Sequence, residues 1–332
     1  MIKNEILKGL ISQLRDIQLD FFKNHGSSDI FSNSKIYEIL IANELGHSLL
    51  PKLSGGRDAK DCDDGEVEYK HFKETSSNHT WTFNDFTDST IEKLRLASCV
   101  VFAHIDDTKE IPYFDWYYLV PSGKVSDYLA VATQKIQNHR KMINVGCSQI
   151  ENNMGIKKSI LKENFKDGKY NSFLLKILEI TREIEKITGI KQILTSNKFW
   201  EMLVSLETGH QIQSEQAGHD AEDEQGNKYE YKVSKNSSWN FQDISDNVLN
   251  KYFKDKEIIL AIVDKKEMKV LKIYSAPPKI VVKTLIRKLE AKKKKFEAEG
   301  KILRRLQVSL TAGDLPIIKA KVIYADVALG GK

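Results

Sequence analysis

Two acids and a lysine recur in this chain at one spacing. In each copy an Asp is followed, after nine residues, by Glu-Tyr-Lys. The six side chains are Asp58, Glu68 and Lys70 in the first copy and Asp220, Glu230 and Lys232 in the second. Carboxylates are the oxygen ligands that Mg²⁺ prefers, and the ion keeps several waters when it is bound in this way. The spacing therefore indicates a pair of divalent-cation sites, each with one ammonium group beside it.

Such a site suits the hydrolysis of a phosphodiester, which repels nucleophiles and has a poor leaving group. A bound metal lowers the pKa of a water and neutralises charge in the in-line transition state. Lys70 or Lys232 would orient the attacking water or stabilise the pentavalent phosphate. The main-chain carbonyls of Tyr69 and Tyr231 are candidates for a further oxygen ligand. The alternative is a surface hairpin with an acid near a lysine, and two matching copies in diverged halves favour the nuclease interpretation.

The repeat extends well beyond this motif. The matching segments are 36–40 with 199–203, 81–85 with 239–243, and 100–106 with 258–264. An interval of about 160 residues is the size of a whole domain and is too long for a solenoid repeat. We expect two fused domains, an N-terminal lobe over residues 1–160 and a C-terminal lobe over 161–332, with the boundary in the polar region 150–170. The chain would then be a monomer that acts as an intrachain pseudo-dimer.

The coarse pattern predicts an α/β (α+β) chain in which both halves have the same elements. Apolar residues at helical spacing predict helices over 2–24, 35–46, 88–97, 172–188, 197–208 and 246–254. Alternating or apolar runs predict strands over 66–73, 99–106, 113–120, 228–234, 258–264 and 268–274. Alternation puts Glu68 and Lys70 on one face of their strand, and a turn at Gly65 brings Asp58 onto the neighbouring strand.

Composition narrows the class of protein. The chain of 332 residues has 41% hydrophobic and 29% charged residues and a net charge of +5, which is ordinary for a globular protein. No apolar run approaches the ~18 residues of a membrane helix, so no membrane partner is expected. Three scattered cysteines fit a cytoplasmic location. The basic clusters 292–295, 304–305 and 139–141 could meet phosphates, or the first could be a solvated helix face.

The motifs resemble the PD-(D/E)XK nuclease superfamily, with Arg57 or His219 where a proline often stands. They are more closely similar to PvuII-type restriction endonucleases, over about residues 20–106 and 190–264. The run that carries the resemblance is His25-Gly26, Gly46, Gly56-Arg57-Asp58-Ala59 and Glu68-Tyr69-Lys70, with Gly218-His219-Asp220-Ala221 and Glu230-Tyr231-Lys232 in the second copy. The resemblance implies a nuclease core around a mixed sheet in each lobe, Mg²⁺ dependence, and cleavage of double-stranded DNA by the two triads. Enzymes of that type are homodimers, whereas this chain joins two unequal halves.

A polar and aromatic segment follows each catalytic strand. In the resembled type the matching region enters the major groove, where amides and histidine suit base edges. The candidate DNA contacts are Lys73, Asn78, His79, Asn84, Lys235, Asn240 and Gln242. The aromatic residues Trp81, Phe83, Trp239 and Phe241 are interpreted as core. Because the two segments differ, we expect an asymmetric or pseudo-palindromic recognition site.

The remaining histidines have structural interpretations. His47 and His210 each follow the repeated glycine and are expected to be structural rather than phosphate contacts, and His104 is expected to be a satisfied core histidine. The function expected from the sequence is a type II restriction endonuclease. The alternatives are a DNA repair or junction nuclease of the same superfamily, a catalytically inactive DNA-binding protein, and an interaction protein with no DNA role.

Overall fold

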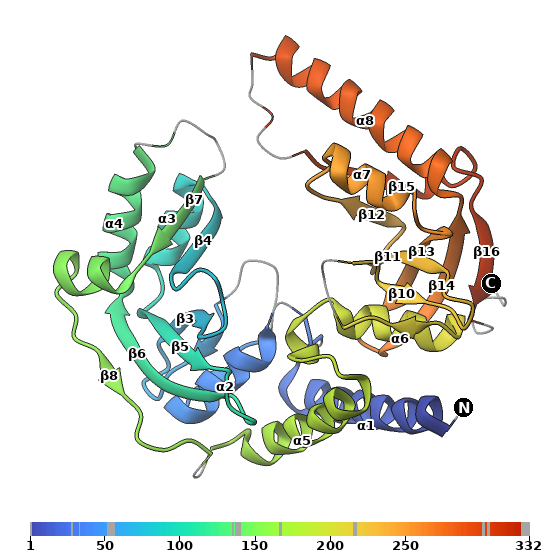
Figure 1. Ribbon diagram of the computed structural model, residues 1–332. Helices are drawn as coiled ribbons and strands as arrows, with labels where there is room; N and C mark the ends of the chain where they lie inside the picture. The colour runs from blue at the N-terminus through green and yellow to red at the C-terminus, as the bar shows by residue number, and fades with distance from the viewer. Residues whose placement is uncertain are drawn as a thin grey trace. The chain divides into compact units, whose positions relative to one another are not determined.

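The chain is a mixed α/β protein with two sheets of six strands each (Figure 1). The computed structural model describes residues 2–27, 29–32, 34–51, 57–134, 136, 141–165, 168–214, 218–300, 303 and 306–326. Among the residues named from the sequence, Gly56, His139, Arg140, Arg304 and Arg305 lie outside this set. Contacts divide the chain into two compact units. We call Asp16–Arg182 the N-terminal lobe, and Met1–Arg15 with Glu183–Lys332 the C-terminal lobe.

These units differ from the expected lobes at the ends. Helix α1 (Ile2–His25) belongs to the C-terminal lobe up to Arg15, and helix α5 (Asn171–Thr188) belongs to the N-terminal lobe up to Arg182. The expected division at residues 160 and 161 follows the polar composition of the connecting segment. Contacts place the division later, because the first turns of α5 pack with the N-terminal lobe. Phe173, for example, lies against Phe21 with ring centroids 4.1 Å apart.

The N-terminal lobe is built on a mixed sheet of order β1-β2-β3-β5-β6-β8. Its strands are β1 (Ser48–Leu49), β2 (Ala59–Lys60), β3 (Glu66–Lys73), β5 (Cys99–Asp106), β6 (Tyr113–Pro121) and β8 (Ser159–Ile160). Strands β3 and β5 are parallel, whereas the other neighbours are antiparallel. Helix α2 (Lys35–Leu45) packs on β1, β3 and β6, and α4 (Ser122–Gln134) packs on β5, β6 and β7 (Lys141–Val145). The sheet is therefore covered on both faces, as the continuous apolar run of β5 requires.

The C-terminal lobe repeats this plan. Its sheet has the order β9-β10-β11-β13-β14-β16, with β11 and β13 parallel. The strands are β9 (Gln211–Ile212), β10 (Ala221–Glu222), β11 (Lys228–Ser234), β13 (Glu257–Asp264), β14 (Lys269–Ala276) and β16 (Lys321–Ala325). Helix α6 (Lys198–Thr208) packs on β9, β11 and β14. Both lobes thus have the same strand order and the same single parallel pair, which supports the duplication inferred from the sequence.

A two-stranded sheet and two helices complete each lobe. In the N-terminal lobe these are β4 (Trp81–Phe86) paired with β7, α3 (Asp88–Arg95) and α4. In the C-terminal lobe they are β12 (Ser238–Phe241) paired with β15 (Val308–Thr311), α7 (Asp246–Tyr252) and α8 (Pro278–Ala298). Three short helical turns cover Gln149–Asn153, Ile193–Thr195 and Ala312–Asp314.

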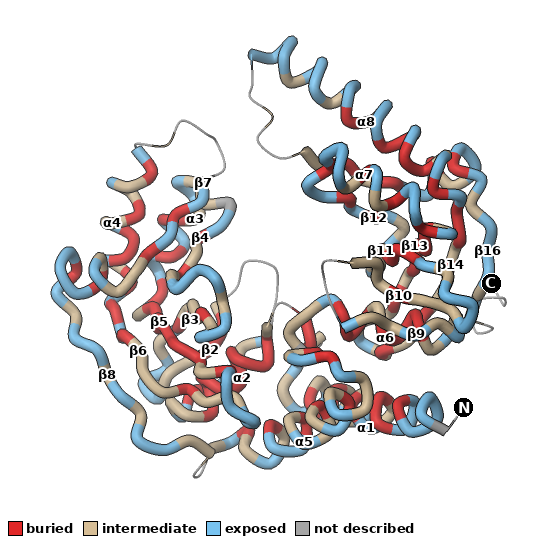
Figure 2. Tube along the Cα trace, viewed as in Figure 1, coloured by how far each residue is buried: buried red, intermediate tan, exposed pale blue. Residues whose placement is uncertain are grey.

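The two cores use matching residues from these small sheets. Trp81 and Trp239 are buried, and each indole N–H donates to a strand carbonyl, Ala103 O at 2.8 Å or Ala261 O at 2.9 Å. Phe83 and Phe241 are also fully buried, which confirms the core interpretation of all four aromatic residues. Figure 2 shows buried residues along the central strands and α2, whereas the far end of α8 is exposed. No helix of the described residues is long and apolar enough to cross a membrane.

Candidate active site

The aspartate of each motif is fixed to the strand that carries the glutamate. The N–H of Asp58 donates to Val67 O at 3.0 Å, and its Oδ2 accepts the N–H of Tyr69 at 2.8 Å. In the C-terminal lobe the N–H of Asp220 donates to Tyr229 O at 3.0 Å, and its Oδ2 accepts the N–H of Tyr231 at 2.9 Å. Since Ala59 pairs with Val67, Asp58 lies beside Glu68 across the ladder. The expected neighbouring strands are therefore present in both lobes.

The turn of each hairpin is closed by a second, matching aspartate. Oδ1 of Asp61 accepts the N–H groups of Asp63 and Gly65, at 3.0 and 2.7 Å. Oδ1 of Asp223 accepts those of Gln225 and Asn227, both at 2.9 Å. Side-chain acceptors of this kind stabilise tight turns. Such a turn fixes the register of the hairpin and hence the place of the catalytic candidates opposite one another.

Glutamate and lysine share one face of the strand, as the alternation predicts. Lys70 Nζ donates to Glu68 Oε1 at 2.6 Å and to Tyr69 O at 3.3 Å. Lys232 Nζ donates to Glu230 Oε1 in the same way. The main-chain carbonyl of Tyr69 thus faces the ammonium group, on the side of the two carboxylates.

The electrostatic environment keeps both lysines charged. Burial lowers the pKa of Lys70, but the carboxylates of Glu68 and Asp58 raise it, and the net shift is upward. The pKa of Lys232 is likewise raised overall, because Glu230, Tyr252 and Asp220 outweigh its burial. Each ammonium also lies near the face of a buried phenylalanine, Phe83 at 5.4 Å or Phe241 at 5.6 Å from the ring centroid. These lysines can stabilise negative charge, whereas a raised pKa disfavours a role as general base.

Each site has a buried ion pair that the sequence interpretation missed. Lys198 Nζ lies 2.7 Å from Glu201 Oε2 and 3.1 Å from Asp220 Oδ1. In the N-terminal lobe, Lys35 Nζ lies 2.8 Å from Glu38 Oε2. Both lysines are the first residue of the helix that packs on the motif strand, β3 or β11, and both are almost fully buried. Buried charges are costly unless they are paired, so the helix brings a third carboxylate and a second ammonium to each motif.

A signal for this pair was present in the sequence. The spacing Lys-x-x-Glu recurs within the matching segments around 36–40 and 199–203. The proximity of Asp220 is reflected in the pKa of Glu201. Burial and the nearby Asp220 raise the pKa of Glu201, and Lys198 opposes this shift. Glu201 is therefore part of the same charge cluster as Asp220 and Lys232.

The two lobes differ around the motif glutamate. Glu68 Oε2 lies 3.9 Å from Arg57 Nη1, whereas Glu230 Oε2 lies 3.3 Å from Lys251 Nζ. His219, at the position of Arg57, instead contacts Glu222 at 3.2 Å. The C-terminal lobe also has a buried Asp255, whose pKa is raised to about 7 by burial and by Glu230. The N-terminal lobe has Ala97 at that position of the repeat, so the two sites are similar in their triads and unequal in their surroundings.

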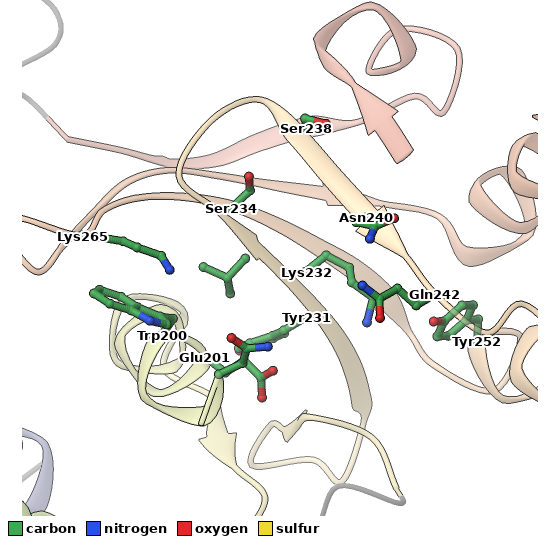
Figure 3. A pocket seen from close by; sticks show the side chains of 12 residues that line it. Trp200, Glu201, Tyr231, Lys232, Ser234, Ser238, Asn240, Gln242, Tyr252 and Lys265 are labelled. Carbon is green, nitrogen blue, oxygen red and sulfur yellow. The ribbon is translucent and has the colours of Figure 1, made fainter. Parts of the chain in front are cut away.

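A cavity of about 430 Å³ opens beside Lys232 in the C-terminal lobe. It is lined mostly by polar residues from α6, β11 and β12: Asn197, Trp200, Glu201, Tyr231, Lys232, Val233, Ser234, Ser238, Asn240, Gln242, Tyr252 and Lys265. Figure 3 shows Trp200 and Glu201 on the helix at one side and Asn240 and Gln242 on the other. The cavity therefore joins a catalytic candidate, Lys232, to two candidate base contacts, Asn240 and Gln242.

The candidate DNA contacts fall into two groups. Six are exposed, namely Asn78, His79, Asn84, Lys235, Asn240 and Gln242. Lys73 is half-buried, and its Nζ lies 3.6 Å from Asp107 Oδ2. His79 stacks on Phe72, with ring centroids 5.7 Å apart, and its Nε2 contacts Glu74 O at 3.0 Å. His79 and Lys73 thus already have contacts within their lobe, as does Asn78, whose Oδ1 accepts from Thr80 Oγ1 at 2.7 Å.

His47, His210 and His104 make contacts within their lobes. Nδ1 of His47 and of His210 each lie 2.8 Å from the hydroxyl of the motif tyrosine, Tyr69 or Tyr231. These contacts link the Gly-His turn to the catalytic strand in both lobes. His104 is buried and contacts both Asp115 and Glu74. All three histidines therefore have the structural surroundings that the sequence interpretation gave them.

The donor set has the chemistry of a hard-cation site. It consists of carboxylates and a main-chain carbonyl, with no sulfur or imidazole in the motif, and this suits Mg²⁺. In the C-terminal lobe Glu230 Oε2 is buried and has no hydrogen-bond donor among the described residues, so it retains acceptor capacity beyond its ion pair. Within the same described residues, no three His, Cys, Asp or Glu side chains are grouped closely enough to hold an ion by themselves. A bound ion would thus depend on carbonyl and water ligands in addition to two carboxylates.

A scan of the sequence against protein-family models finds no match, and a search of curated proteins finds none. The site geometry and the order of the motifs are therefore what support a function for this chain.

Proposed function

We propose that the chain is a Mg²⁺-dependent DNA endonuclease of the type II restriction kind, in which each lobe cuts one strand of a duplex. The observation that carries this proposal is the repeated arrangement of the triad. In both lobes the aspartate binds the main-chain N–H that follows the glutamate, and the lysine binds that same glutamate. A hairpin with no catalytic role would not need this arrangement of three side chains. The two halves have diverged in sequence, and both retain it.

The chain's own residues have distinct roles in the proposed reaction. Asp58, Glu68 and the Tyr69 carbonyl would hold the ion in one lobe, and Asp220, Glu230 and the Tyr231 carbonyl would hold it in the other. When bound, Mg²⁺ supplies an activated water and neutralises charge on the phosphate. Lys70 and Lys232 are kept protonated by their acidic neighbours and would stabilise the negative charge of the transition state. The exposed amides of Asn240 and Gln242 would contact base edges next to the cut.

A cleavage assay on supercoiled plasmid tests this proposal. We expect discrete linear fragments in Mg²⁺ and intact plasmid in EDTA. A smear in Mg²⁺ would indicate a nonspecific nuclease, and cutting confined to branched or damaged DNA would indicate the junction or repair alternative. A gel shift without any cutting, across a range of plasmid sequences, would indicate a DNA-binding protein. The absence of both cutting and binding would reject the proposal.

A further inference from the structure

Asn240 lines two hollows of the C-terminal lobe. One is the cavity beside Lys232, and the other is a groove of about 350 Å³ between α8 and β15. The other residues that line the groove are Lys288, Ala291, Lys292, Gln307, Val308 and Ser309. Asn240 is exposed on β12, which pairs with β15. The cavity of the candidate active site and a second hollow with two lysines in its wall therefore share one lining residue.

The groove has the chemistry of a phosphate contact. Lys292 Nζ donates to Gln307 O at 2.8 Å, which holds the ammonium at the wall of the groove. An ammonium has three donors, so Lys292 retains donors for an anion. Lys288 differs, because its Nζ donates to Ser309 O and also pairs with Asp314. Ala291 and Val308 add apolar surface, which suits a sugar between two phosphates.

At the matching positions, which lie among the residues that the structure describes, the N-terminal lobe has no lysine. Helices α4 and α8 both follow a proline, Pro121 or Pro277, but α8 has 21 residues and α4 has 13. Counted from the prolines, the buried pairs Val125 with Val281 and Leu129 with Leu285 coincide. In the same register, Ala132 and Ile136 stand at the positions of Lys288 and Lys292. In the separate register that pairs Trp81 with Trp239, Thr82 stands at the position of Asn240. The two lysines of the groove are therefore not repeated at the matching described positions of the other lobe.

We propose that this groove binds the sugar-phosphate backbone of the DNA strand that leaves the catalytic cavity at Asn240. The C-terminal lobe would then contact DNA farther from its cut than the N-terminal lobe does. This inference rests on the proposed DNA substrate. Charge complementarity favours DNA as the occupant, because the remaining N–H donors of Lys292 belong to a cation. The neighbouring Asn240 is also a proposed DNA contact. Contacts of this kind position the duplex and read no sequence.

Two adjacent lysines provide a matched test. Lys292 lies half-buried at the groove, whereas Lys293 is the next residue of α8 and is exposed outside the groove lining. Lys292→Gln and Lys293→Gln remove the same charge one residue apart. Binding to a fluorescein-labelled duplex of mixed sequence is measured in EDTA by anisotropy, across a series of KCl concentrations. We expect Lys292→Gln to reduce the slope of log K against log salt by about 0.9, the value for one phosphate contact, and Lys293→Gln to leave it unchanged.

Further variants separate the groove from folding and from the proposed function. Lys292→Arg should restore the wild-type slope. The melting temperatures of all variants should stay within a few degrees of the wild type, because the one main-chain hydrogen bond of Lys292 contributes about 1 kcal/mol. Suppose that the wild type binds and cuts DNA. Equal salt slopes for Lys292→Gln and Lys293→Gln would then overturn this inference and leave the proposed function standing. A wild-type chain that neither binds nor cuts DNA would overturn the proposed function as well.

Discussion

Lys198 Nζ lies 3.1 Å from Asp220 Oδ1 and is a buried cation beside the proposed metal ligands. It also pairs with Glu201 at 2.7 Å. The pKa of Lys198 is lowered by burial and raised more by Asp220 and Glu201, so it stays charged. A positive charge here offsets the repulsion between the carboxylates of Asp220 and Glu201.

The first prediction concerns the removal of this charge. Lys198→Met should destabilise the chain by about 3–5 kcal/mol, because it leaves the largely buried carboxylates of Glu201 and Asp220 without this partner. If those carboxylates bind Mg²⁺, the ion should restore more stability to the variant than to the wild type, since a ligand of the folded state stabilises it by mass action. The measurement is the melting temperature of both proteins in EDTA and in a Mg²⁺ series.

Lys256→Met is the control for this experiment. Lys256 is more exposed and pairs with Asp223 at 3.4 Å, away from the triad. We expect a small loss of stability, of at most about 1 kcal/mol for a surface ion pair, and no change in the response to Mg²⁺. If Lys198→Met responded to Mg²⁺ no more than Lys256→Met does, Asp220 and Glu201 would not be facing a metal site.

The second prediction separates the two triads. Lys70→Ala should slow cutting of one strand by about a hundredfold or more, the effect of losing one transition-state donor, and leave the other strand to be cut normally. Lys232→Ala should do the same to the opposite strand. The products on supercoiled plasmid would be nicked circles, and sequencing of the nicks would assign a strand to each lobe. If either single variant lost both cuts together, the lobes would share one catalytic centre.

Local patterns explain why the framework was predictable. Strands 66–73, 99–106 and 228–234 were predicted with the bounds that the structure gives them, because alternation or continuous burial marks every residue of those strands. The position of Asp58 beside Glu68 followed from the turn at Gly65. The hairpin depends on neighbours within one short segment, and strand 99–106 is marked by its own apolar run.

Features that depend on distant segments were not predictable in this way. Strand β4 pairs with β7, and Trp81 lies opposite Val145. The sequence of neither segment indicates which segment it pairs with. Lys35 and Lys198 were missed for a different reason. A lysine at the start of an apolar helix is usually taken for its solvated end, and only the packing of α2 and α6 on the catalytic strands shows that both are buried.

The third prediction uses the difference between Asp255 and Ala97. Folding raises the pKa of Asp255 to about 7, so between the ordinary aspartate range and pH 7 the folded chain holds a proton that the unfolded chain has released. Stability from this group therefore falls as the pH rises through that window. As the pH rises through this window, the free energy of unfolding of Asp255→Ala should increase relative to that of the wild type by about 1.4 kcal/mol per pH unit. This difference should level off above pH 7.

Thermal unfolding of Asp255→Ala and wild type at several pH values in EDTA checks this difference. Asp246→Ala is the control, because Asp246 is exposed in the first turn of α7. The stability difference between Asp246→Ala and the wild type should not change with pH in this way. A difference between Asp255→Ala and wild type that stayed constant from acidic to neutral pH would show that the carboxyl group has an ordinary pKa in the folded chain.

The fourth prediction distinguishes base contacts from backbone contacts in the C-terminal lobe. Gln242 and Lys235 are both exposed near the catalytic strand, but an amide can read a base edge and an ammonium meets a phosphate. Gln242→Ala should relax the preference at one base pair of the cleaved site, at a cost of about 1–3 kcal/mol on the preferred sequence. Lys235→Ala should weaken binding to all sequences alike and lower the salt slope.

Cleavage of a randomised-site library, sequenced before and after digestion, measures both effects at once. The same library tests the asymmetry expected from the unequal reading segments, in which Asn84 of one lobe corresponds to Gln242 of the other. Because these amides differ by one methylene, the wild type should prefer different bases, or the same base with different stringency, in the two half-sites. Two identical half-sites that respond equally to Gln242→Ala would mean that Gln242 lies outside the reading surface, and the pattern of Lys235→Ala would then decide whether the segment contacts DNA at all.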